Sequence, residues 1–181
     1  MELEGRIIGI ISNKKEEVDE EKSVEELVTY RTDDSLKMVN LSTEIKNKKY
    51  KDLSSKDKNK VLLASKLQDK EIKLYDFSKG MTKKELDFFK RLFKRITSYN
   101  KQIFLYSKDA EIFLNCVDHI YLTNGENVMY TSTSMFDPTI YMEMDPPEII
   151  DFILRCEDLG VRLDEYTDIN DLIKAIYRIK S

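Results

Sequence analysis

Residues 53–77 read LSSKDKNKVLLASKLQDKEIKLYDF and hold the pattern on which the fold depends. Ser54 or Ser55 can cap a helix, because a serine side chain accepts a hydrogen bond from a free N–H in the first helical turn. Residues 72–77 (IKLYDF) then form a short apolar segment that predicts a strand with an acidic residue at its end. A helix followed directly by a strand favours an α/β architecture. The apolar positions on one side of this helix are Val61, Leu62, Ala64 and Leu67.

The chain after this stretch continues the alternation. Thr82 is expected to cap a strongly amphipathic helix, TKKELDFFKRLFKRITSY, whose large apolar residues recur at helical spacing. Asn124-Gly125 is a typical tight-turn pair and predicts a hairpin. The sequence therefore predicts an α/β sheet with an antiparallel hairpin towards its end. The other expected elements are a strand over 102–106, a short helix over 109–115, a strand over 117–122 and a strand over 127–131.

The chain before residue 53 is less regular. Residues 6–11 (RIIGII) predict a buried strand, in which Gly9 permits close approach of another group to the backbone. The charged residues that follow are expected to form a surface loop or the start of a solvated helix. Residues 27–30 predict a second strand, and residues 31–52 an irregular or partly helical surface.

The last third of the chain changes character at Asp145-Pro146-Pro147, because paired prolines end one element and open the next helix. A helix with Gly160 as its C-cap and a second helix capped by Thr167 or Asp168 are expected. We therefore divide the chain into an α/β domain over 1–144 and a helical interaction region over 145–181. A helical layer packed back on the sheet is the alternative. The candidate interface residues are Ile149, Ile153, Ile169, Leu172, Ile173 and Ile176.

Composition excludes several classes of protein. The 181 residues include 30 Lys and Arg against 34 Asp and Glu, and this acidic balance argues against a nucleic-acid binder. No apolar run reaches the ~18 residues that span a bilayer, and the N-terminus lacks the features of a secretory signal, so a cytoplasmic protein is expected. Cys116 and Cys156 lie 40 residues apart and His119 is the sole histidine, so neither a disulfide framework nor a metal site is indicated.

The order of these segments resembles the ATPase domain of ABC transporters. GRIIGII is similar to the strand before the phosphate loop, residues 53–67 to the signature helix, and residues 71–77 to the Walker B strand. IFLYSKD resembles the strand before the switch histidine, and VDHIYLTNGENVMY the hairpin after it. The tail from Asp145 is similar to the C-terminal helical region of the ATPase subunits of energy-coupling-factor (ECF) transporters. The resemblance implies a truncated P-loop NTPase-type sheet with a C-terminal helical appendage.

The resemblance also assigns positions, and most of them carry unusual residues. Asp76 matches the Walker B aspartate that holds Mg²⁺, although capping of the strand end is an equal alternative. Phe77 stands where the family has its catalytic glutamate. The signature retains Leu53 and Ser54 but replaces Gly-Gly-Gln by Ser55-Lys56-Asp57. Lys108 occupies the position of the switch histidine.

The phosphate loop is the largest departure from the family pattern. Such a loop needs glycines, whose backbone N–H groups converge on phosphate, and a Lys-Ser or Lys-Thr pair. Residues 12–19 read SNKKEEVD, with no glycine and three carboxylates, so Lys14 and Lys15 are expected to be solvated loop charges. The tract 12–52 is also too short for the family's glutamine loop and helical subdomain.

These departures predict a pseudo-ATPase that acts through protein–protein association. The expected partner is an ABC-type ATPase subunit or a second copy of the chain, in an ECF-type assembly that reaches a membrane transporter component through the partner. No cofactor is expected, and weak residual binding of Mg-ATP is left open. The alternatives are a non-hydrolysing nucleotide or Mg²⁺ sensor, using Asp76, Lys108 and Lys14 or Lys15, and a stand-alone regulatory binding module derived from the fold.

Overall fold

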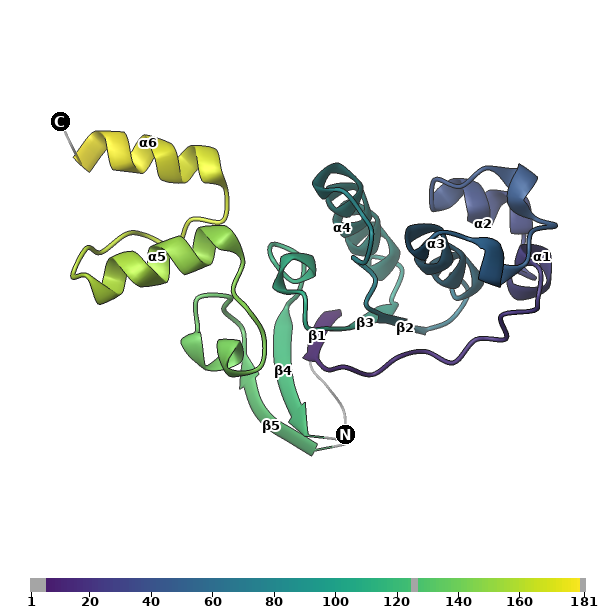
Figure 1. The fold of residues 1–181 in the computed structure, drawn as a ribbon, viewed down its shortest axis with the longest axis horizontal. Helices are drawn as coiled ribbons and strands as arrows, with labels where there is room; N and C mark the ends of the chain where they lie inside the picture. Colours follow the sequence, from purple (N-terminus) through teal and green to yellow (C-terminus); the bar gives the residue numbers. More distant parts are fainter. Residues whose placement is uncertain (1–5, 125–126, 180–181) are drawn as a thin grey trace.

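A computed structural model describes residues 6–124 and 127–179 of the chain. Its described strands form one five-stranded sheet in the order β2-β3-β1-β4-β5 (Figure 1). The first four pair in parallel and β5 runs antiparallel to β4. The predicted α/β sheet with a terminal hairpin is therefore confirmed. The strands are β1 (Ile7–Ile11), β2 (Glu71–Tyr75), β3 (Gln102–Ser107), β4 (His119–Asn124) and β5 (Asn127–Ser132).

Strand β1 lies at the centre of the sheet, and every one of its residues is buried. It pairs with β3 on one side and with β4 on the other, which explains its uninterrupted apolar sequence. Gly9 permits close packing, as predicted, because a Cβ atom there would lie 3.1 Å from the ring of Phe113.

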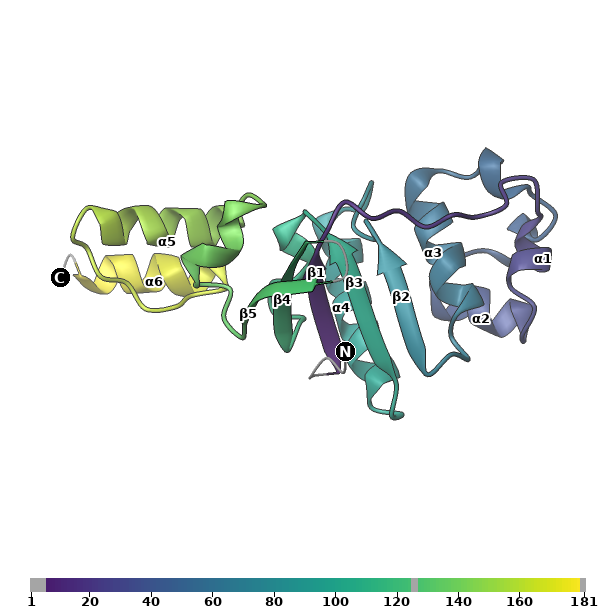
Figure 2. The ribbon, with the colours of Figure 1, turned by 90° about the horizontal axis from the view of Figure 1, so that it is seen from below.

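Two helices cover one face of the sheet, α3 (Ser55–Ser65) and α4 (Lys83–Thr97) (Figures 1 and 2). Ser54 caps α3, since its side chain accepts from the N–H of Asp57. Thr82 and Glu85 form the capping box of α4, in which each side chain bonds the backbone N–H of the other residue. Both caps follow from the sequence, and the buried faces of α3 and α4 enclose the main apolar core.

The opposite face of the sheet carries a second, smaller apolar cluster. Ile8, Ile10, Phe104 and Tyr121 form it, and Tyr106 and Val128 pack against them. Residues of β1 thus alternate between the two faces, as the two-residue period of a strand requires.

The tract between β1 and α3 is a loop followed by short helices at the β2 end of the sheet (Figure 1). The predicted strand over 27–30 is wrong. Leu27 ends helix α1, and Val28 is fully buried by helix packing instead of strand pairing. The short helices are α1 (Val24–Leu27), α2 (Thr32–Met38), η1 (Thr43–Ile45) and η2 (Tyr50–Asp52), so the partly helical character expected over 31–52 is confirmed. The segment is not all surface, because Leu36, Val39 and Tyr50 are buried in the main core.

The remaining elements lie towards the β5 end of the sheet. The expected short helix over 109–115 is a 3₁₀ turn, η3 (Ala110–Ile112), and Gly125 of the expected hairpin turn lies outside the described residues. After β5 come η4 (Pro138–Met142), α5 (Glu148–Asp158) and α6 (Ile169–Ile179). Helices α5 and α6 lie side by side beyond β5 (Figures 1 and 2). Gly160, just after α5, has a φ of +80°, the left-handed conformation expected of a helix C-terminus.

Candidate functional site

Asp76 follows β2 and has a φ of +46°, a left-handed conformation that non-glycine residues seldom adopt. Its N–H donates to the carbonyl of Tyr106 at 2.9 Å. The side-chain amide of Asn59 donates at 3.0 Å to the carbonyls of both Asp76 and Phe77. These bonds, which involve only the backbone atoms of Asp76 and Phe77, fix the turn at the end of β2.

Phe77 turns into the helical layer. Its side chain is 2% exposed and forms edge-to-face contacts with Phe89 at 5.0 Å and Phe93 at 5.2 Å between ring centroids. Such aromatic pairs stabilise a core beyond the burial of their area. The residue at this position thus serves packing between β2 and α4, and its side chain points away from the solvent edge of the sheet.

The segment that resembles the signature motif forms the start of α3. Ser54 donates from its hydroxyl to Asp57 Oδ2 at 2.8 Å, and accepts from the N–H of Asp57. Lys56 Nζ lies 3.2 Å from Oε1 of Glu85 on α4. Leu53, Ser54, Ser55, Lys56 and Asp57 therefore lie together as a capped first turn, with Leu53 half-buried against the core.

Glu85 joins this turn to α4. Hydrogen bonds from Thr82, and then from Lys56 and Lys60, lower its pKa to about 2. The Lys60 side chain is only 5% exposed, and its Nζ lies 3.3 Å from the same carboxylate oxygen. A buried ammonium is costly without such a partner, so Glu85 is central to the α3–α4 packing.

Lys108 follows β3 and forms an ion pair with Glu143 at 3.3 Å. The two residues line a cavity of about 480 Å³ at the carboxyl ends of β1 and β4. Lys14 and Thr123 also line this cavity. Polar ligands of α/β proteins often bind at this edge of a parallel sheet.

Lys15 and Asp76 lie at a different cavity of about 230 Å³, beside the first turn of α3. The residues considered for a nucleotide or Mg²⁺ sensor are therefore divided between two places, Lys14 with Lys108 and Lys15 with Asp76. Neither of these two cavities contains all four residues.

The other titratable candidates are Cys116 and His119, and both lie against packed side chains. Burial raises the pKa of Cys116 to about 11, which makes its thiol a poor nucleophile. His119 opens β4 with its ring 6.2 Å from that of Tyr121. Among residues 6–124 and 127–179, no three His, Cys, Asp or Glu side chains are grouped so as to hold a metal ion. Within the same residues, none of the helices combines the length and the apolar character needed to cross a membrane.

The candidate interface residues divide into three groups by exposure. Ile153 and Leu172 are 3% and 2% exposed and are therefore buried within the protein. Ile169 and Ile173 on α6 are 48% and 44% exposed. Ile149 and Ile176 are intermediate.

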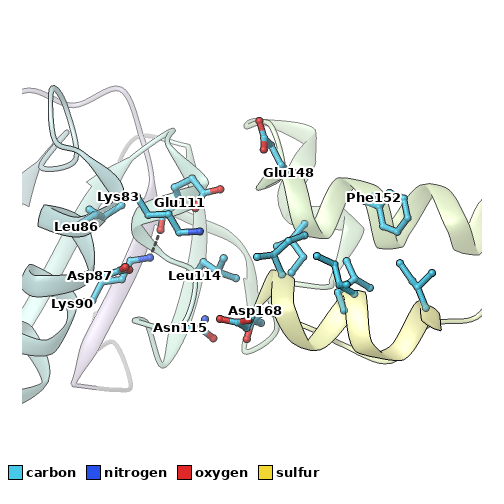
Figure 3. A pocket seen from close by; sticks show the side chains of 16 residues that line it. Lys83, Leu86, Asp87, Lys90, Glu111, Leu114, Asn115, Glu148, Phe152 and Asp168 are labelled. Carbon is cyan, nitrogen blue, oxygen red and sulfur yellow. Dashed lines mark hydrogen bonds between the residues drawn. The ribbon is translucent and has the colours of Figure 1, made fainter. Parts of the chain in front are cut away.

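The exposed members of this set line a groove of about 620 Å³ between α4 and the α5–α6 pair (Figure 3). Sequence reasoning missed the other wall, which is formed by Leu86 and Lys90 of α4 and by Leu114 after η3. It also missed Phe152 on α5, which is 44% exposed. The apolar periodicity of α5 includes Phe152, but only the tertiary structure brings it to the same cavity as the α4 residues.

Neither a protein-family model nor a curated protein matches the chain. Solved structures of ABC transporter cassettes do match. The post-hydrolysis dimer of the ATP-binding cassette MJ0796, bound to ADP and Pi, aligns with a TM-score of 0.54 and 17% identity, over 70% of this chain and 62% of that one. An inward-facing ABC transporter of the metal-chelate type aligns with a TM-score of 0.50 and 16% identity, over 73% and 60%.

CbiO1 from Clostridium perfringens, part of the ABC transporter complex cbiONQ, aligns over 84% of this chain and 65% of that one, with 19% identity and a TM-score of 0.48. The chain spans less than two thirds of the length of each of these three structures. The fold is thus a shortened ABC-ATPase-like α/β fold.

Proposed function

We propose that the chain is a catalytically inactive ABC-ATPase-like protein that acts by associating with an ABC-type ATPase subunit or with a second copy of itself. The burial of Phe77 is the observation that carries this proposal. The position that would hold a catalytic glutamate points into the core, where a carboxylate would be desolvated and unable to activate water.

The loop after β1 supports the same conclusion, because its residues do not fit a triphosphate. Residues 12–19 contain no glycine, and Ser12 Oγ accepts from the N–H of Lys14 at 3.0 Å, which uses one of the amides that could face an anion. Glu16 of this loop is paired with Lys66. The loop therefore has carboxylates, and no glycine, where a phosphate-binding loop needs converging N–H groups.

The exposed apolar residues of α5 and α6 support association. Phe152, Ile169 and Ile173 are each close to half exposed, and they lie beside one groove. Contiguous apolar surface of this kind is more typical of an interaction site than of a solvated face.

The nature of the partner rests on fold and sequence likeness. The MJ0796 cassette that shares the fold was solved as a dimer, and another structural match is an ABC transporter of the metal-chelate type. The tail from Asp145 adds its resemblance to ECF-type ATPase subunits. Contact with a membrane component would then come through the partner.

Analytical ultracentrifugation tests the proposal. The purified chain is sedimented alone, and with an ABC-type ATPase subunit of the ECF type, across micromolar concentrations. A complex or a dimer that Ile173→Asp weakens by about tenfold is expected, because the variant places a charge in the apolar contact. Tyr99→Asp is the control, since Tyr99 is 72% exposed and follows the far end of α4. Monomer under all conditions would refute association and favour a stand-alone binding module.

One observation favours a second function, a nucleotide or anion sensor without turnover. Lys14 and Lys108 converge on the cavity at the carboxyl ends of β1 and β4. Isothermal titration with millimolar Mg-ATP decides this alternative. Heat of binding that is lost in Lys108→Ala supports it, and the absence of heat eliminates it.

A further inference from the structure

The groove between α4 and the α5–α6 pair is lined by apolar side chains, and several of them remain exposed in the folded chain. Three of its lining residues, Leu86, Leu114 and Leu172, are at most 7% exposed. Three others, Phe152, Ile169 and Ile173, remain 44–48% exposed. The groove is therefore lined by both buried and exposed apolar side chains.

The walls of the groove are helical. Figure 3 shows Lys83, Leu86, Asp87 and Lys90 of α4 on one side, and α5 and α6 on the other. None of the described strands contributes a lining residue, so no unpaired strand edge is present to recruit an extended peptide. A surface of this type suits a helix that lays its apolar side into the groove.

The charged residues around the groove indicate the charge expected on a segment that binds there. Glu148 and Asp168 are the charged residues that α5, α6 and the α6 cap contribute to the lining. On the opposite wall Lys90 is half-buried, and desolvation lowers its pKa, while its ammonium donates to the carbonyl of Glu111. Asp87 and Glu111 also line the groove, so its carboxylates outnumber its lysines by four to two. Lys83, the other lysine, lies close enough to Asp168 to help lower the pKa of that carboxyl group. The lining as a whole is therefore acidic.

We propose that this groove binds an amphipathic helix of a partner protein, with apolar residues on one face and Lys or Arg along the flank that meets Glu148 and Asp168. The inference rests on the proposed function and names the kind of segment through which the partner binds. It assigns α5 and α6 the role of a clamp, with Phe152 and Ile173 as its apolar contacts.

A fluorescent, helix-forming peptide of leucines at helical spacing with lysines elsewhere is the probe. Fluorescence anisotropy is measured with the full chain and with a matched peptide in which glutamate replaces lysine. The lysine peptide is expected to bind at least tenfold more tightly than the glutamate peptide. Ile173→Asp should weaken binding about tenfold, and Tyr99→Asp should leave it unchanged.

Charge reversal at the groove supplies the second measurement. Glu148→Lys combined with Asp168→Asn, which retains a helix-capping side chain, should reduce the preference for the lysine peptide severalfold. Circular dichroism establishes that each variant is folded. Equal binding of the two peptides, or equal loss in Ile173→Asp and Tyr99→Asp, would overturn the inference.

Failure of this inference is distinguishable from failure of the proposed function. If the ATPase subunit binds the chain but Ile173→Asp and the Glu148 variant bind as well as the parent, association stands and the groove is not the site. If 1-anilinonaphthalene-8-sulfonate fills the groove and neither peptide displaces it, the groove is a small-molecule pocket, which also overturns the inference.

Discussion

The end of β2 and the groove beside α6 use large apolar side chains in opposite ways. At the end of β2, Phe77 is enclosed by Phe89 and Phe93 and leaves almost nothing exposed. Beside α6, Phe152 and Ile173 remain close to half exposed. In the related ABC fold the first place is where chemistry is expected. In this chain that place is packed and the apolar surface left open lies elsewhere, which is the reason for proposing association instead of catalysis.

Truncation of the two phenylalanines tests this contrast most strongly. Phe77→Ala is expected to lower the free energy of unfolding by about 3–5 kcal/mol, because it leaves a cavity among buried aromatic rings. Phe152→Ala should lower it by less than about 1 kcal/mol, since much of that ring is already in water. Urea denaturation followed by circular dichroism measures both. Similar losses would contradict the contrast.

Removal of the Glu85 carboxylate is the next largest change. Glu85→Ala should cost about 2–3 kcal/mol, because the buried Lys60 loses its counter-charge and α4 loses part of its cap. The same urea measurement checks this value. Glu21→Ala is the control, since Glu21 is paired with Lys49 and Lys51 in solvent and should change stability little. An equally large loss in both variants would show that Glu85 has no special part in the α3–α4 packing.

The pH dependence of stability gives a smaller effect of defined sign. The pKa of Glu85 is lowered from 4.5 to about 2 in the folded protein. Its contribution is therefore complete above about pH 4.5 and is lost as the pH falls towards 2. The midpoint temperature of thermal unfolding, measured from pH 6 down to pH 2.5, should fall less steeply in Glu85→Gln than in the parent. Parallel curves would mean that the carboxylate is not stabilised on folding.

Much of the fold could be predicted from local patterns. The caps at Ser54 and Thr82, the five sheet strands and the C-terminal helices follow from short-range chemistry that the sequence displays directly. The strand predicted over 27–30 failed because Val28 is buried by helices, and an apolar residue alone does not distinguish the two environments. Ser23 and Glu26 form a capping box, and this S-x-x-E spacing would have indicated the helix instead.

The candidate site was harder to predict than the fold. The sequence shows that Phe77 cannot act as a base, but only tertiary packing against Phe89 shows where the side chain points. The groove likewise depends on α4 and α6, which are distant in sequence. Nothing in the local sequence around Leu86 and Lys90 therefore indicates that they line it. Conversely, the exposure of Ile169 and Ile173 could be expected from the apolar stripe of α6. A single neighbouring element does not cover so wide a stripe, so some of its residues remain exposed to solvent.

An ATP hydrolysis assay on the purified chain is the decisive test of whether the protein works without catalysis. Phosphate release with Mg-ATP is compared between the parent chain and Asp76→Ala, with and without an ABC-type ATPase subunit. We expect no release by the chain alone above the buffer level, and no difference between the two proteins. Hydrolysis by the chain alone that is abolished in Asp76→Ala would contradict the proposal that it works without catalysis.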